Sequence, residues 1–85
     1  PQPDWYSPEK VVLSLDESKL EDSDKMTLVI ILDEAKNIQQ GKIIDLVTSF
    51  LPAPGIDILK SRGYSVWTRR EGENLVRSSF LKPPG

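Results

Sequence analysis

The feature that most constrains the fold of this chain is an uninterrupted apolar run, Met26 to Leu32, which Asp33 and Glu34 follow at once. The run is rich in β-branched Val, Ile and Thr, which fit a pleated strand. It is also shorter than the ten or so residues that a buried helix usually needs. Its apolar side chains fall on both faces, which is typical of a strand covered on both sides. We therefore predict a central strand over residues 26–33.

The same segment, Leu-Val-Ile-Ile-Leu-Asp-Glu-Ala, resembles the Walker B strand of nucleotide-hydrolysing proteins. That resemblance implies that Asp33 would help to hold Mg²⁺ and that Glu34 would polarise water. Phosphate binding in those proteins also needs the motif Gly-x-x-x-x-Gly-Lys-Ser/Thr. The chain lacks it, since Gly41-Lys42 is followed by Ile43. A fragment of a nucleotide-hydrolysing protein is therefore kept only as a remote alternative.

His and Cys are both absent from the 85 residues. Their absence excludes disulfides, the usual zinc sites and catalytic triads based on Cys or His. We therefore expect a protein that is not an enzyme and that uses no cofactor and no metal. A chain of this length fits one domain, which buries only about 60% of the surface that its unfolded form exposes. We do not expect such a domain to enclose a deep pocket beside its core.

Residues 1–8 contain three prolines and predict an extended arm, followed by a single domain over residues 9–82 and a tail over 83–85. Within the arm, we expect the adjacent aromatic residues Trp5 and Tyr6 to pack back onto the domain. No apolar stretch reaches the roughly 18 residues of a membrane span, and no signal-peptide pattern is present. We therefore expect an intracellular, cytoplasmic protein that does not contact a membrane.

Four further segments show a pattern that predicts local structure. Residues 10–16 alternate apolar and polar side chains, which predicts a half-buried strand, and the polar, acidic residues 17–25 predict a loop. Apolar residues recur with helical spacing over residues 38–51, which predicts the main helix, ended by a proline. Residues 56–63 predict a short helix with a glycine in its left-handed cap, and a strand is the alternative there.

The segment 64–81 predicts a β-hairpin whose turn has Gly72 as the first central residue, as a type II′ turn requires. This turn fixes the pairing of the two strands. Arg70 and Arg77 would then share one face of the hairpin, and Arg69 would point to the other face.

This hairpin carries the candidate partner-binding residues, which are Tyr64, Trp67, Arg69, Arg70, Arg77 and Phe80. Arginine with interleaved aromatics can bind nucleic acid, because arginine pairs with phosphates while Tyr and Trp stack on bases. Residues 46–85 carry six basic residues against three acidic ones, but the whole chain has a net charge of −2, which counts against a nucleic-acid surface. A small nucleic-acid-binding domain is therefore the alternative, and a protein-interaction module is the leading hypothesis.

The predicted elements give an α+β fold: a four-stranded, mostly antiparallel sheet packed on one main helix, in the order β-β-α-(short α)-β-β. Ubiquitin-like (β-grasp) domains have this order, and the comparison is one of fold alone. One main helix covers only one face of such a sheet, so the apolar residues on its second face need the arm, the short helix or another protein. We therefore expect a non-catalytic interaction module or a small subunit of a larger assembly. Its partner would be another protein or a second copy of the chain.

Overall fold

The computed structural model describes residues 2–18 and 24–84, and residues 1, 19–23 and 85 lie outside the described part of the chain. A 3₁₀ turn at Pro8–Lys10 leads into a mixed sheet with two helices. The elements, in chain order, are β1 (Val11–Asp16), α1 (Asp24–Ala35), β2 (Ile43–Thr48), α2 (Ala53–Ser61), β3 (Ser65–Gly72) and β4 (Leu75–Leu81).

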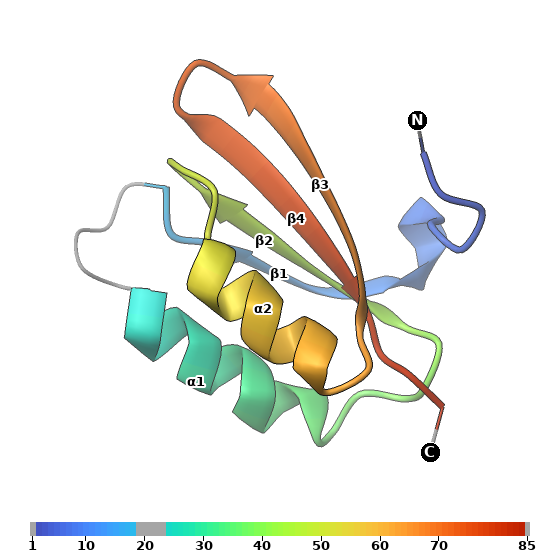
Figure 1. Ribbon diagram of the computed structural model, residues 1–85. Helices are drawn as coiled ribbons and strands as arrows, with labels where there is room; N and C mark the ends of the chain where they lie inside the picture. The colour runs from blue at the N-terminus through green and yellow to red at the C-terminus, as the bar shows by residue number, and fades with distance from the viewer. Residues whose placement is uncertain (1, 19–23, 85) are drawn as a thin grey trace.

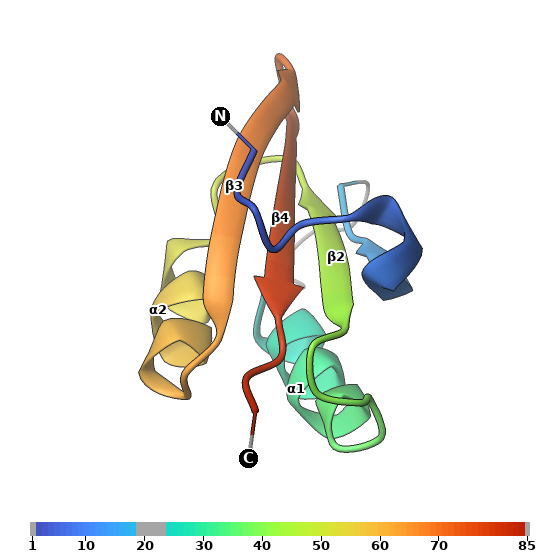
Figure 2. The same cartoon turned by 90° about the vertical axis from the view of Figure 1, so that its right-hand side faces the viewer.

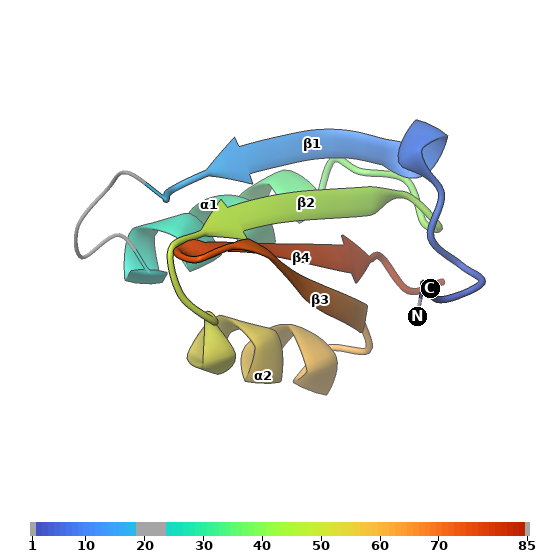
Figure 3. The same ribbon diagram turned by 90° about the horizontal axis from the view of Figure 1, so that it is seen from above.

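The sheet has the order β1-β2-β4-β3, and both helices pack on one of its faces (Figures 1 and 3). β1 and β2 run parallel, whereas β4 is antiparallel to both β2 and β3. The predicted class, a small α+β fold with a four-stranded sheet, is confirmed. The predicted element order is wrong, because α1 stands where a strand was expected and β2 where the main helix was expected.

Residues 26–33, predicted as the central strand, belong to α1. Parallel strands such as β1 and β2 need a crossover of a dozen or more residues, which is usually a helix. Thr27 and Ile31 are buried and stand four residues apart, the spacing of one helix face. Val29 and Ile30, on the outer side, are 64% and 41% exposed. These outer residues are as apolar as the buried ones, so the helical period is invisible in the sequence.

The helix predicted over residues 38–51 is replaced by β2, which lies between β1 and β4 at the centre of the sheet. All six residues of β2 are buried, and strands covered on both faces read as near-continuous apolar runs. Gly41 has a φ of +81°, a left-handed conformation that turns the chain into β2 and that a helical first turn does not contain.

The predicted hairpin forms, but its register is shifted. Glu73 and Asn74 make the connection, and an irregularity between Arg70 and Gly72 takes up one residue of β3. Gly72 is not among the described glycines with positive φ, so the type II′ turn predicted around it does not form. As a result, Arg69 lies directly opposite Arg77 on the same face of the sheet, and Arg70 pairs with Val76 on the other face.

The alternation predicted for residues 10–16 is confirmed in β1, and the predicted short helix is α2, which begins three residues earlier than expected. Gly63 follows α2 with a φ of +92°, as the sequence predicts. The core lies between the sheet and the helices and consists of Ile31, Ala35, Ile44, Leu46, Ile56, Leu59 and Phe80. None of the helices in the described ranges has the length and apolar character that a membrane span requires.

Candidate functional site

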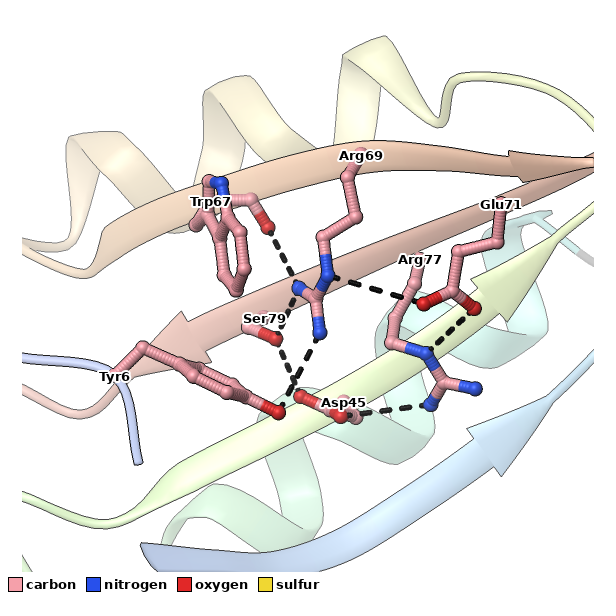
Figure 4. A network of polar contacts seen from close by, with 7 residues as sticks. All are labelled: Tyr6, Asp45, Trp67, Arg69, Glu71, Arg77 and Ser79. Carbon is pink, nitrogen blue, oxygen red and sulfur yellow. Dashed lines mark hydrogen bonds and ion pairs between the residues drawn. The ribbon is translucent and has the colours of Figure 1, made fainter. Parts of the chain in front are cut away.

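A polar network occupies the sheet face opposite the helices, called here the open face (Figure 4). At its centre is Asp45, in the middle of β2 and only 4% exposed. Ser79 donates a hydrogen bond of 2.5 Å to Asp45 Oδ1, and Arg77 Nη1 lies 3.5 Å from Asp45 Oδ2. Glu71 accepts a hydrogen bond of 2.9 Å from Arg77 Nε. A buried carboxylate in a central strand is therefore balanced by one hydroxyl and one guanidinium from the neighbouring strand.

The Arg69 guanidinium connects this network to the N-terminal arm. It lies 3.9 Å from the centre of the Trp67 ring and 5.0 Å from that of Tyr6, and it donates a hydrogen bond of 2.7 Å to Ser79 Oγ. The rings of Tyr6 and Trp67 meet edge to face, with their centres 4.9 Å apart. Figure 2 shows the arm passing across the strands on its way to β1. The expectation that the arm packs back onto the domain is confirmed for Tyr6.

The open-face arginines are engaged within the molecule. Glu71 contacts both of them, at 2.9 Å from Arg77 and 4.0 Å from Arg69. The hydrogen bond to Glu71, helped by the charges of Glu71 and Asp45, raises the pKa of Arg77 above its usual value. A phosphate would therefore have to displace these acidic partners. This arrangement gives little support to a nucleic-acid surface on the hairpin.

The residues predicted to bind a partner do not form one surface. Trp67, Arg69 and Arg77 lie together on the open face, whereas Arg70 pairs with Val76 on the opposite face of the hairpin and donates a hydrogen bond to the Glu73 carbonyl. Tyr64 packs against the core, and burial raises the pKa of its hydroxyl.

Phe80, also predicted as an anchor, is 1% exposed and belongs to the core. The register explains this placement, because Phe80 pairs with Ile44 and Val66, which both face the helices. Phe80 therefore has no surface to offer to a partner.

A cavity of about 390 Å³ lies between α1, α2 and the sheet beneath them. It is lined by Glu17, Thr27, Leu28, Ile31, Leu46, Pro52, Pro54, Gly55, Ile56, Ile58, Leu59 and Phe80. The expectation of no deep pocket is wrong. The space arises because α1 and α2 follow parallel strands, so both helices begin at the same end of the sheet (Figure 1). Crevices at the carboxyl ends of parallel strands are common ligand sites.

Glu17 and Thr27 form the polar end of this cavity. Glu17 directly follows β1 and is 5% exposed, and Thr27, in α1, is 7% exposed. The Thr27 hydroxyl donates a hydrogen bond to Glu17 Oε2. Sequence reasoning did not find this pair, because the two residues are brought together only when α1 folds back over the sheet.

Apart from Val12 in β1, the large apolar side chains that stay exposed among the described residues lie in α1, in the loop before α2 and in α2, and we call them the outer helical surface: Val29, Ile30, Phe50, Leu51 and Ile58. Their exposed fractions range from 37% for Ile58 to 64% for Val29. Ile58 also lines the cavity, and Phe50 and Leu51 precede Pro52 at its edge. The sequence places Phe50 and Leu51 in an apolar stripe, but the predicted helix that would have buried them does not form.

Within the described residues, no group of three or more Asp, Glu, His or Cys side chains is arranged to hold a metal ion. Asp33 and Glu34, the acidic pair of the Walker B resemblance, are exposed at the end of α1 rather than at the end of a strand. Asp33 lies 3.9 Å from Lys36, an ion pair on the surface.

No protein-family model matches the chain, and neither characterised proteins nor solved structures give a match.

Proposed function

We propose that the protein is a non-catalytic protein-interaction module that docks a partner protein on the outer helical surface. The observation that carries this proposal is the exposure of five large apolar side chains in α1, in α2 and in the loop before α2. Single exposed apolar residues are ordinary, but groups of them mark interaction sites. The proposal keeps the function expected from the sequence and moves its surface from the hairpin to the helices.

The composition of α1 supports this surface. A helix that is apolar all round is normally buried, whereas a surface helix carries a polar outer stripe. α1 turns Thr27 and Ile31 inward, and it presents Val29 and Ile30 on its outer side. A partner that covered these two residues would give α1 the buried environment that its composition favours.

The open face supports a partner less well. Its central arginines are held by Glu71 and Asp45, and the Tyr6 ring already lies against Trp67. A partner would have to break these contacts before making its own. The side chains of the outer helical surface are hydrocarbons, so they hold no hydrogen bond or ion pair that a partner would have to break.

Random peptides displayed on phage and selected against the immobilised protein test the proposal. Selected peptides should carry apolar anchors, and their binding should shift the amide NMR resonances of α1 and of the loop before α2. Val29→Lys should weaken binding at least about tenfold, because it places a charge where an apolar contact forms. The matched control is Val12→Lys, since Val12 is 51% exposed but lies on β1, outside this surface.

Failure to select any peptide above background would refute the proposal. It would also be refuted if binding were lost in the Val12 variant and kept in the Val29 variant. Sedimentation of the chain at increasing concentration shows whether a second copy can serve as the partner. Self-association that Val29→Lys abolishes would identify the partner as another copy of this chain.

A further inference from the structure

We propose that the cavity between α1, α2 and the sheet binds a small uncharged molecule with a hydrocarbon body. This inference goes beyond the proposed function, because it concerns a small ligand beneath the helices rather than a protein on their outer side. It is carried by the size of the cavity, by its hydrocarbon lining and by the way in which the carboxylate at its polar end is already engaged.

The size and lining are those of a ligand site. The volume of about 390 Å³ lies within the range of about 300–1,000 Å³ that is typical of small-molecule pockets. Apart from Glu17 and Thr27, the described lining residues are apolar, most of them aliphatic, with Phe80 as the aromatic residue. A water molecule needs two to four polar partners, which hydrocarbon walls do not supply, so an apolar ligand displaces water readily from such a space.

The lining extends from the surface of the helical layer down to the sheet. Pro54 and Ile58 of α2 are exposed, whereas Ile31, Leu59 and Phe80 are almost fully buried. A ligand can therefore enter between the two helices and reach the core. There it would bury hydrocarbon surface on several sides, which is the main driving force for binding of an apolar ligand.

The polar end of the cavity favours an uncharged ligand over either ion. Glu17 is buried and already accepts a hydrogen bond from the Thr27 hydroxyl. A ligand cation would have to compete with the partners that Glu17 already has, and it would exchange its hydration for hydrocarbon walls. A ligand carboxylate would lose its hydration in the same way and would meet no Lys or Arg among the described lining residues. An uncharged ligand avoids both costs.

Gly55 offers a way to fill the cavity without removing a side chain. It belongs to the lining, and a Cβ atom there would lie 3.9 Å from Leu28 Cδ1 of α1, an ordinary contact distance. A methyl group therefore fits, but a longer side chain would extend into the space between α2 and α1. Alanine and leucine both favour a helix over glycine, so Gly55→Ala and Gly55→Leu differ mainly in how much of the cavity they fill.

Three probes with the same naphthalene body test the proposal on the full chain at neutral pH: naphthylmethanol, which is uncharged, naphthylmethylamine, a cation, and naphthoate, an anion. Naphthylmethanol should bind at least about tenfold more tightly than either ion, because it has no charge to desolvate. Its ring should shift the methyl NMR resonances of Ile31 and Leu59, which line the cavity. The methyl resonances of Val12, exposed on β1, should stay unchanged.

The variants locate the probe. Gly55→Leu should weaken binding of naphthylmethanol at least about tenfold, because its side chain takes the place of the ligand, and Gly55→Ala should change binding by no more than about threefold. Val29→Lys should leave binding unchanged, because Val29 is exposed and is not part of the lining. If Gly55→Leu does not fold, the shifts of Ile31 and Leu59 in the unchanged protein decide where the probe lies.

The proposal is overturned if naphthylmethanol does not bind, if either ion binds as tightly, or if Gly55→Leu binds naphthylmethanol as well as the unchanged chain does. Its failure is distinguishable from failure of the proposed function. Val29→Lys should weaken peptide binding on the outer helical surface and leave the naphthylmethanol titration unchanged. Loss of naphthylmethanol binding in this variant would place the probe on the outer helical surface and would also overturn the inference.

Discussion

The ion pair between Asp45 and Arg77 offers the sharpest test of how this sheet is held together. Asp45 lies in the central strand β2 and is 4% exposed, while the Arg77 side chain in β4 is 30% exposed. Arg77→Met removes the charge and keeps most of the side-chain length. Asp45→Asn removes the opposite charge and keeps an oxygen for the Ser79 hydroxyl. The two variants and their combination form a double-mutant cycle.

The structure sets the expected coupling energy between Asp45 and Arg77. At the observed separation of 3.5 Å, two unit charges attract by about 5 kcal/mol at an effective dielectric constant of about 20. Desolvation of Asp45 and the partial exposure of Arg77 offset most of this attraction. Exposed pairs couple by about 0.2–1 kcal/mol, whereas removing one partner of a buried pair costs about 3–5 kcal/mol. We therefore expect a coupling energy of about 1.5 kcal/mol, and a loss of about 2–3 kcal/mol for Arg77→Met alone.

Urea unfolding of the four proteins at neutral pH gives this coupling energy. The loss of the Arg77–Glu71 hydrogen bond occurs in both proteins that carry Arg77→Met, so it cancels from the cycle. The control pair is Lys36 with Asp33, whose side chains are 77% and 74% exposed and 3.9 Å apart. Its coupling should be below about 0.5 kcal/mol. A coupling at Asp45 no larger than that of the control, or an unchanged stability of the Arg77 variant, would refute the reasoning.

Two further predictions concern α2 and the residue that follows Gly63. Gly55→Ala should raise the free energy of unfolding by about 0.5 kcal/mol, because alanine favours the helix and its Cβ meets nothing closer than 3.9 Å; destabilisation in urea unfolding would contradict this. Burial raises the pKa of Tyr64 above the usual tyrosine value of about 10, so the folded protein holds this proton more tightly than the unfolded chain. The resulting stability is complete below about pH 10 and is lost as the pH rises through the folded pKa. The free energy of unfolding should therefore fall less above pH 10 in Tyr64→Phe than in the unchanged chain. Urea unfolding that shows the same fall in both proteins would contradict this prediction.

The elements that could be predicted from the sequence are those whose two faces differ. In β1, Leu13 and Leu15 face the core and alternate with exposed Val12 and Ser14, so the pattern with a period of two is visible. The hairpin is bounded by turn residues that are local in sequence. The end of α2 follows from Gly63, because a left-handed cap needs a glycine.

The two segments whose predicted type is wrong, residues 26–33 and 38–51, show no difference in polarity between their two faces. α1 carries Val29 and Ile30 outside and Ile31 inside, and every residue of β2 is buried. Periodicity reports a difference between two sides of an element, so it carries little information where both sides are apolar. Whether such a segment becomes a helix or a strand is then decided by the parallel pairing of β1 with β2, because this pairing requires a crossover between them, usually a helix.

The polar sites could be predicted only in part. The sequence indicates Trp67, Arg69 and Arg77 as candidates because arginines and aromatics interleave in the hairpin, but their common face depends on one irregular residue between Arg70 and Gly72. The Glu17–Thr27 pair at the cavity depends on how α1 returns over the sheet. Such contacts between distant segments leave no local pattern in the sequence.

The strand order β1-β2-β4-β3 also has a consequence for folding during synthesis. β2 pairs with β1 on one edge, and its other edge pairs with β4, the last strand in the described chain. Until β4 leaves the ribosome, β2 presents an unpaired edge of apolar residues, and Phe80 is missing from the core. Exposed apolar edges of this kind promote aggregation. The β1-α1-β2-α2 intermediate should therefore depend on chaperones, and the native sheet should form only as the final hairpin closes it.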